Sequence, residues 1–233
     1  MIMNKIIEFK NVVKEYKSGD HILKAMDDVN FTIEEGEFVV ILGPSGAGKS
    51  TLMKCLFGIY TKDGGKIFLD GKEVNFKNSK DALDNGVTMV HQELNQALKR
   101  NVMDNLWLGR YPLKAGVMVD EKKIYDDTVA LFDKLGLVVN PKQIMSTMPV
   151  SQRQMVEIAK AVSYNAKVIV LDEPTAFLDI PTRFEICRLL SDLAHNQGKT
   201  IIFSTHELDI ATKMCDSIAL IDTPKLLHLP AAE

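Results

Sequence analysis

The sequence predicts an α/β fold in which a parallel sheet carries a phosphate-binding site at the ends of its strands. Two observations predict it. Three short, almost entirely apolar runs have the composition of strands buried on both faces of a parallel sheet: Phe38–Leu42, Val168–Leu171 and Thr200–Ser204. The first of these runs leads into a glycine-rich stretch, Gly43–Thr51, and then into a segment with helical character, Leu52–Phe57. A phosphate-binding loop requires this strand–loop–helix order.

The glycine-rich stretch matches the pattern G-x-x-x-x-G-K-S, and it reads Gly43, Pro44, Ser45, Gly46, Ala47, Gly48, Lys49, Ser50, Thr51. Glycines let the backbone wrap a phosphate so that successive N–H groups point inward, and the following helix adds its positive N-terminal end. We expect Lys49 to reach the β- and γ-phosphates and Ser50 to hold Mg²⁺. The alternative is a glycine-rich turn that carries a lysine by chance. The motif in this setting favours a nucleoside-triphosphate site.

Length and composition limit the class of protein. The 233 residues suffice for one large domain or for one domain with an inserted lobe. Hydrophobic residues make up 46% of the chain and charged residues 25%, as in a globular protein with a substantial core. The net charge of -3 argues against a basic surface for nucleic acid. We expect no signal peptide and no membrane span, so that any membrane connection runs through a partner.

The three cysteines, Cys55, Cys187 and Cys215, do not have the spacing of metal ligands. We expect buried apolar thiols in a reducing compartment.

Strand-forming sequence surrounds the first helix. The run Ile6–Val13 alternates loosely, and Val29–Ile33 alternates as a half-buried antiparallel strand does. Lys66–Leu69 precedes Asp70-Gly71, a strong signal for a two-residue hairpin turn. Val87–Val90 is a further short strand. We therefore expect an antiparallel edge beside the parallel core.

From about Asn101 to Ser163 the apolar spacing becomes helical, with one helix at Ile124–Leu135 and a loop at Gly109–Asp120. We interpret this region as a helical lobe inserted between core strands. The expected division is residues 96–163 for the lobe, and residues 1–95 and 164–233 for the core.

The remaining sequence predicts a helix at Thr182–Ala194 that Gly198 ends, a helix at Leu208–Met214 and a strand at Ser217–Ile221. We expect Leu226–Glu233 to be a tail that is too short for a further domain.

Two acids follow the apolar run Val168–Leu171. Carboxyl ends of parallel strands meet at the ligand crevice of an open α/β sheet. There Asp172 can hold Mg²⁺ through water, and Glu173 is the candidate base or polarising group for the attacking water. The alternative is a pair of acids that cap the turn before Pro174. Because the phosphate loop is also present, we favour the catalytic interpretation.

Three other residues are candidates by position. Gln92 follows a strand and can offer its amide to Mg²⁺ or to the attacking water, and His206 can donate to the γ-phosphate. Taken alone, His206 is better explained as a loop histidine that bonds its own backbone. Tyr16 can stack on adenine, or it is an ordinary aromatic residue at a strand end.

The stretch Met148–Gln154 opens a helix at Met155–Val162, with Ser151 as the expected N-cap. A helix start is also an anion site, although a capped helix explains the pattern equally well. Two phosphate-directed helix starts in one chain suggest that one serves a partner's nucleotide.

These motifs together resemble the ATP-binding subunits of ABC transporters over essentially the whole chain. Gly43–Ser50 match the Walker A loop, and Val168–Glu173 match Walker B with its catalytic glutamate. The other loops of the family match in kind: the adenine-stacking A-loop at Tyr16, the Q-loop at Gln92, the D-loop at Leu178–Asp179 and the H-loop at His206.

The resemblance implies a P-loop NTPase fold with a RecA-like core, an antiparallel β edge and an inserted helical subdomain. It also implies ATP and Mg²⁺ as cofactors, and two domains that sandwich two nucleotides. Each nucleotide would lie between Lys49 of one domain and Ser151 of the other, with Gln154 and Asp179 also at the nucleotide. The implied role is ATP hydrolysis that drives import, with coupling through Gln92 and Glu93–Asp104.

The implied partners are transmembrane permease subunits and, through them, a solute-binding protein. A second copy or a second ATPase domain would complete the ATP-bound dimer, and nucleic acid is not an expected partner. The implied place is the cytoplasm, at the inner face of the cell membrane.

The stretch Val150–Gln154 departs from the family's usual L-S-G-G-Q, because Ser151 and Gln154 keep their places while both glycines are missing. Monosaccharide importers of the galactose/methyl-galactoside and ribose type resemble this variant. Residues 1–175 look like the first ATPase domain of the galactose type, most clearly at Met89–Asn95 and Asn101–Arg110. We therefore expect uptake of a monosaccharide such as galactose.

In that sugar family two ATPase domains follow one another, whereas this chain holds one. From Ala176–Pro181 onward the sequence looks closer to ATPases of iron, haem or siderophore importers, which makes a hybrid chain a hypothesis. The alternatives are therefore an iron-chelate importer, or an isolated domain with weak ATPase activity and no role in transport. A soluble ABC protein of DNA repair or translation is disfavoured, because the chain has neither a coiled-coil insertion nor a basic character.

Overall fold

The computed structural model describes residues 4–19, 21–176, 178–222 and 225–230. The chain divides into two compact units. The first, here called the core unit, comprises residues 1–92 and 166–233, and the second, the helical unit, comprises residues 93–165. From the sequence we expect the helical lobe to span residues 96–163.

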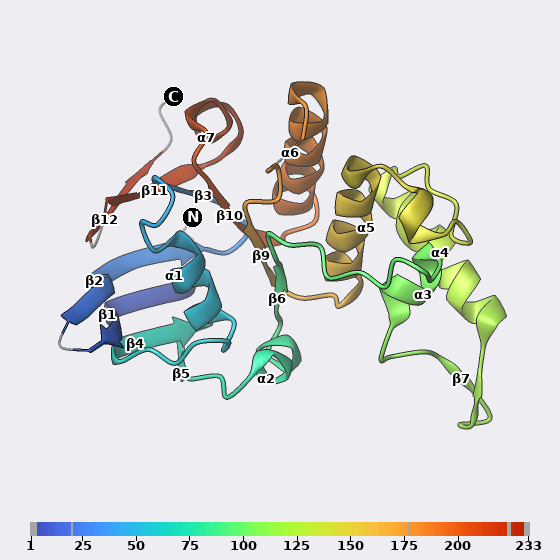
Figure 1. Ribbon diagram of the computed structural model, residues 1–233, viewed down its shortest axis with the longest axis horizontal. Coiled ribbons are helices and arrows are strands. Elements are labelled where there is room, and N and C mark those ends of the chain that lie inside the picture. Colours follow the sequence, from blue (N-terminus) through green and yellow to red (C-terminus); the bar gives the residue numbers. More distant parts are fainter. Residues whose placement is uncertain (1–3, 20, 177, 223–224, 231–233) are drawn as a thin grey trace. The chain divides into compact units, whose positions relative to one another are not determined.

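A six-stranded sheet runs through the core unit (Figure 1). Its strand order is β12 (Lys225–Pro230), β11 (Ser217–Asp222), β3 (Phe38–Leu42), β10 (Thr200–Thr205), β9 (Val168–Asp172), β6 (Val87–Val90). All neighbours pair in parallel except β11 and β12, which pair antiparallel. The carboxyl ends of five strands therefore lie at one edge, where the predicted polar residues follow them.

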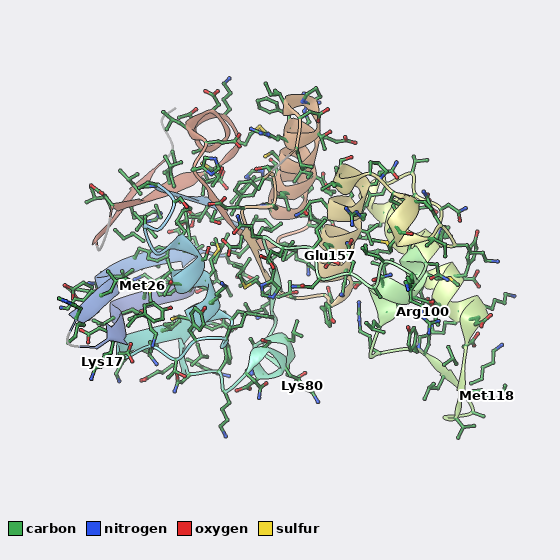
Figure 2. The ribbon with its side chains drawn as sticks, viewed as in Figure 1. Lys17, Met26, Lys80, Arg100, Met118 and Glu157 are labelled. Atoms are coloured by element: carbon green, nitrogen blue, oxygen red, sulfur yellow. The ribbon has the colours of Figure 1, made fainter. Side chains whose placement is uncertain are left out.

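A four-stranded antiparallel sheet forms the other layer of the core unit, in the order β2 (His21–Glu34), β1 (Lys5–Ser18), β4 (Gly64–Leu69), β5 (Lys72–Val74). The predicted turn between β4 and β5 is present, with positive φ at Asp70 and Gly71. Apolar side chains from both sheets and from α1 (Lys49–Leu56) form one buried cluster that includes Met26 (Figure 2). The antiparallel edge expected from the sequence is thus confirmed, with β1 and β2 longer than expected.

Three more helices belong to the core unit: α2 (Ser79–Asp84), α6 (Ile180–His195) and α7 (Leu208–Met214). The bounds of α7 agree with the prediction. Helix α6 begins two residues earlier than predicted, because Asp179 caps it and Pro181 fits its first turn. Helix α2 was not predicted. It is short, and the residue that marks its start in the sequence is the N-cap Asn78, whose side chain accepts the Asp81 N–H at 3.0 Å.

The helical unit contains α3 (Val102–Trp107), α4 (Glu121–Leu135), the 3-10 turn η1 (Met145–Thr147) and α5 (Val150–Ser163). The expected loop Gly109–Asp120 is wrong in part, since it holds a small hairpin, β7 (Leu113–Lys114) and β8 (Met118–Val119). Two-residue strands leave almost no alternation to detect. Met118 on this hairpin is 68% exposed (Figure 2).

The tail expected at Leu226–Glu233 also needs correction. Residues up to Pro230 form β12, which pairs along the whole of β11, and residues 231–233 lie outside the described residues. An edge strand needs only one neighbour, so a few apolar residues suffice. None of the helices that the structure describes has the length and apolar run that crossing a bilayer requires.

Candidate functional site

A cavity of about 270 Å³ in the core unit lies at the carboxyl ends of the parallel strands. Its lining comes from three places: the glycine-rich loop and the start of α1, the residues that follow β6 and β9, and the β1–β2 hairpin. These residues are Ser45, Gly46, Gly48, Lys49, Ser50, Thr51, Gln92, Glu173, Tyr16, Leu23, Lys24 and Ala25. The fold therefore brings together residues far apart in the sequence that were predicted to act on one nucleotide.

The loop between β3 and α1 depends on its glycines. Gly48 has φ +98°, and a Cβ atom there would lie 2.4 Å from the carbonyl oxygen of Ala25. A Cβ atom on Gly43 would lie 2.5 Å from the carbonyl oxygen of Ile221. Only glycine tolerates both the backbone angle and the close approach at Gly48. Gly48 is the N-cap of α1 and no side chain caps it, so the first amide groups of α1 can bond to an anion.

Lys49 is the first residue of α1 and is 4% exposed. Its Nζ atom donates hydrogen bonds to the carbonyl oxygens of Gly43 at 2.7 Å and Pro44 at 3.0 Å. The same atom lies 3.3 Å from Oε1 of Glu173. Gly43 and Pro44 therefore serve the site by fixing this ammonium group. They do not line the cavity, and neither does the buried Ala47.

Asp172 ends β9 and is 2% exposed. Its Oδ1 atom accepts hydrogen bonds from the hydroxyl groups of Ser50 and Ser204, both at 2.9 Å. Hydroxyl, carboxylate and amide oxygens suit Mg²⁺, and Gln92 lines the same cavity. The described residues contain no group of three His, Cys, Asp or Glu side chains that could hold a metal ion. Because Mg²⁺ in proteins usually keeps several water or phosphate oxygens as ligands, the few oxygen donors of Ser50, Asp172 and Gln92 fit this ion.

Glu173 has φ +47°, an unusual angle for a residue other than glycine. Its N–H donates to the Ser204 hydroxyl at 3.0 Å, which helps to hold this conformation. Its Oε2 atom lies 3.5 Å from Nδ1 of His206, which follows β10 and whose side chain is 56% exposed. This contact differs from the local backbone bond that the alternative reading of His206 predicts. Strained backbone of this kind is typical of functional sites.

Tyr16 lies inside β1, not at a strand end, and pairs directly with Leu23 across the β1–β2 hairpin. Both side chains line the cavity, and both expose apolar surface. The Tyr16 ring also contacts Tyr60 edge-on, with 6.2 Å between the ring centroids. An aromatic face of this kind can stack on a nucleobase. Sequence reasoning missed Leu23, Lys24 and Ala25, because only the hairpin register reveals that they neighbour Tyr16.

Another contact that sequence reasoning missed holds the segment after β9. Arg183 on α6 pairs with Glu207, the residue after His206, and its Nε atom donates to the carbonyl oxygen of Leu178 at 2.7 Å. Asp179 caps α6 by accepting the Thr182 N–H at 3.1 Å, and hydrogen bonds from Thr182 lower the pKa of its carboxyl group. Asp179 does not line the cavity.

Ser151 and Gln154 lie in the helical unit, at the start of α5. The expected N-cap role of Ser151 is wrong. Helix α5 begins at Val150 and its N-cap is Pro149, whose carbonyl oxygen accepts the Arg153 N–H at 3.1 Å. Pro149 has an extended backbone just outside the helix, so the helix begins before Ser151 and places the serine in its first turn. Gln154 is 5% exposed, and its Nε2 atom has no hydrogen-bond partner among the described residues.

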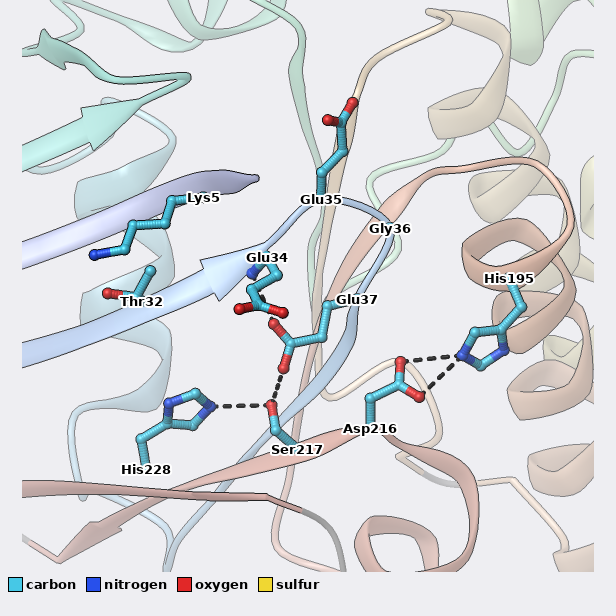
Figure 3. Close-up of a pocket in the computed structure, with 10 residues that line it drawn as sticks. All are labelled: Lys5, Thr32, Glu34, Glu35, Gly36, Glu37, His195, Asp216, Ser217 and His228. Carbon is cyan, nitrogen blue, oxygen red and sulfur yellow. Dashed lines mark hydrogen bonds and ion pairs between the residues drawn. The ribbon is translucent and has the colours of Figure 1, made fainter. Parts of the chain in front are cut away.

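A larger cavity of about 640 Å³ lies in the core unit where β3 and β11 begin, away from the glycine-rich loop. Most polar groups there satisfy one another (Figure 3). The Ser217 hydroxyl bonds to Glu37, His228 Nε2 lies 3.0 Å from that hydroxyl, and His195 Nε2 lies 3.0 Å from Asp216. The smaller cavity, and not this one, collects the predicted site residues.

The chain is similar to known ATP-binding proteins. A galactose/methyl galactoside import ATP-binding protein of Fusobacterium nucleatum is 50% identical over 216 residues, 93% of this chain and 42% of that protein. The protein of the same name from Treponema denticola is 49% identical over 231 residues, 97% of this chain and 45% of that protein. The chain thus spans less than half the length of these curated relatives.

An alignment of 231 residues includes most of the segment after residue 175. The expected closer likeness of residues 176–233 to iron, haem or siderophore importers stays a prediction.

Among solved structures, an ATP-binding cassette in a dimeric, post-hydrolysis state bound to ADP and Pi has a TM-score of 0.85 at 26% identity. The match covers 98% of this chain and 100% of that chain. The predicted P-loop fold of an ABC ATPase is therefore confirmed. The ABC transporter family model matches residues 26–176, about two thirds of the chain. The protein belongs to the ABC transporter family.

Proposed function

We propose that this chain binds ATP with Mg²⁺ and hydrolyses it as the ATP-binding subunit of an importer for galactose or a related monosaccharide. The observation that carries the proposal is the meeting of Lys49 with Glu173 in one cavity, with Asp172 bonded to Ser50 beside it. A glycine-rich phosphate loop and two acids at the end of a buried strand are the parts that ATP hydrolysis requires.

Each residue has a definite role in this proposal. The amide groups of the loop and Lys49 bind the phosphates, and Tyr16 with Leu23 supports the base. Ser50, Asp172 and Gln92 would hold Mg²⁺, which offsets the negative charge of the phosphates when bound. Glu173 accepts a proton from the attacking water or orients it, and His206 supports Glu173 and donates toward the terminal phosphate.

The sugar is proposed from the names of the relatives, which are import proteins for galactose and methyl galactoside. We infer that transmembrane permease subunits, and through them a solute-binding protein, are the partners. The chain would then work at the inner face of the cell membrane, where it has access to cytoplasmic ATP.

A second copy or a second ATPase domain is the remaining proposed partner. Support comes from the start of α5, where no side chain among the described residues caps the first N–H groups of the helix. A helix start with uncapped N–H groups is suited to an anion such as a phosphate of a facing nucleotide. Sedimentation of Glu173→Gln with ATP and Mg²⁺ tests this: we expect a dimer that ADP does not support. If Glu173→Gln sediments as a monomer with ATP as well as with ADP, a second copy is not the partner.

The main test is ATP hydrolysis by the chain alone and in liposomes with the permease subunits. We expect Mg²⁺-dependent turnover that galactose-loaded binding protein stimulates, and turnover at least about a hundredfold lower in Glu173→Gln with ATP binding retained. Glu185→Gln is the matched control, since Glu185 is an exposed residue of α6 outside the cavity. Equal hydrolysis by Glu173→Gln and the control would contradict the assignment of Glu173. Stimulation by another solute and not by galactose would contradict the assignment of the sugar.

A further inference from the structure

The ammonium group of Lys49 already has three partners within the protein. An ammonium group has three N–H donors. Two of them meet the carbonyl oxygens of Gly43 and Pro44, at 2.7 and 3.0 Å. The Glu173 carboxylate forms an ion pair with the same ammonium group, with Oε1 3.3 Å from Nζ. A phosphate group that binds Lys49 therefore meets the Glu173 carboxylate at the same ammonium group.

The three partners of the Lys49 ammonium group are not equally easy for a phosphate to displace. The carbonyl groups of Gly43 and Pro44 belong to the backbone of the loop, and the close approach of Gly43 to Ile221 keeps that backbone in place. The Glu173 carboxylate is at the end of a side chain with rotatable bonds. It is also the one negatively charged acceptor, so it occupies the place that an anionic ligand would take.

The pair is shielded from water, since the side chains of Lys49 and Glu173 are 4% and 15% exposed. Charge pairs at this depth are screened little by solvent. Separating the Glu173 carboxylate from Lys49 therefore costs free energy, which reduces the net free energy of phosphate binding. The other oxygen of Glu173 faces His206, so a carboxylate that leaves Lys49 has a second polar neighbour.

We propose that Glu173 competes with the nucleotide phosphates for Lys49 and thereby lowers nucleotide affinity. Phosphate binding releases the carboxylate from the lysine, and only then is Glu173 available to the attacking water. The same residue thus restrains the loop before it serves hydrolysis. This inference rests on the proposed function, because it concerns the proposed catalytic carboxylate.

The test is the Kd of ADP without Mg²⁺, measured by titration calorimetry. ADP is used because it has no γ-phosphate to hydrolyse. Two variants separate contact from charge. Glu173→Gln removes the charge, whereas Glu173→Asp keeps the charge on a side chain about 1.5 Å shorter, which no longer reaches Lys49. Aspartate also tolerates the positive φ at this position better than glutamate does.

We expect both variants to bind ADP about three- to tenfold more tightly than the parent chain. Glu185→Gln, which removes an exposed carboxylate of α6 outside the cavity, serves as the matched control and should leave the Kd unchanged. If only Glu173→Gln binds ADP more tightly, charge repulsion explains the effect and the proposed competition is wrong. Unchanged affinity in both variants would also overturn it. If the parent chain and every variant fail to bind ADP or ATP, the proposed function itself fails, and the inference fails with it.

Discussion

The Ser50 hydroxyl donates a 2.9 Å hydrogen bond to Oδ1 of Asp172, across 122 positions of the sequence. The same oxygen accepts the Ser204 hydroxyl at 2.9 Å. One buried carboxylate therefore ties the start of α1 to the ends of β9 and β10. These are oxygen ligands of the kind that Mg²⁺ prefers, and their pairing brings a serine of the phosphate loop and an acid of a distant strand together at the proposed ion site.

Asp172→Asn should separate nucleotide binding from the use of Mg²⁺. Asparagine keeps the shape and an oxygen for Ser50, but it removes the negative charge that attracts the cation. We expect ATP binding without Mg²⁺ to persist, and turnover at saturating ATP to fall by about a hundredfold or more. The measurement is ATPase rate against Mg²⁺ concentration, with Asp192→Asn, an exposed change on α6, as the control. An unchanged Mg²⁺ dependence would exclude Asp172 as a ligand.

Lys49→Ala should weaken nucleotide binding about tenfold or more, because the phosphates lose their one buried ammonium partner among the residues that line the cavity. Titration calorimetry with ATP measures the change. Lys54→Ala is the matched control, since Lys54 lies on the same helix and its ammonium group is over the Tyr60 ring, outside the cavity. Equal ATP affinities of the two variants would show that Lys49 does not bind phosphate.

The cysteines should react slowly in the folded protein. Burial raises the pKa of Cys55 and of Cys215 to about 11 and that of Cys187 to about 12, from an ordinary value of 9.0. Only the thiolate is alkylated, so at pH 8 we expect labelling by iodoacetamide about a hundredfold slower than in urea. Mass spectrometry of timed samples measures the rates. Labelling in native buffer as fast as in urea would contradict the burial.

The same pKa shifts set a pH dependence of stability. Each thiol has a higher pKa when folded than when unfolded, so the unfolded chain releases its protons first as the pH rises. The contribution of the thiols to stability is therefore complete below about pH 9 and declines toward pH 11 to 12. The midpoint of urea denaturation should fall between pH 8 and pH 10. The fall should be smaller in Cys187→Ser, which lacks one of the three thiols.

The sequence predicted the buried parts of the fold best. The strands β3 and β6 have the predicted bounds, because strands covered on both faces consist of continuous apolar residues. Short elements with polar faces were missed, as with α2 and the β7–β8 hairpin, because a few residues hold too little periodicity. The N-cap of α5 was misplaced because a proline can begin a helix without a side-chain cap.

Much the same holds for the site. That Lys49, Asp172 and Glu173 lie together could be predicted, since each belongs to a short motif that is recognisable in the sequence. Leu23, Ser204 and the Arg183–Glu207 pair could not, since each acts through a partner set by strand register or by packing. The contact between Lys49 and Glu173 belongs to this second class, although both residues belong to the first.

Finally, Gly48→Ala should harm the site more than Gly46→Ala does. Both glycines have positive φ, +98° and +82°, so alanine costs about 1–2 kcal/mol of backbone strain at either position. Only at Gly48 does the new Cβ atom collide with the backbone, at 2.4 Å from the Ala25 carbonyl oxygen, whereas nothing lies within 4 Å at Gly46. The loop or β2 must therefore move in Gly48→Ala, and both line the cavity.

We expect Gly48→Ala to weaken ATP binding at least about tenfold and Gly46→Ala by a few-fold, measured by titration calorimetry. Gly71→Ala is the control for strain alone, since Gly71 has φ +72° in the β4–β5 turn with open space around it. It should lower the melting temperature while leaving the Kd of ATP unchanged. If Gly48→Ala and Gly46→Ala bind ATP equally well, the close approach of Ala25 does not shape the phosphate loop.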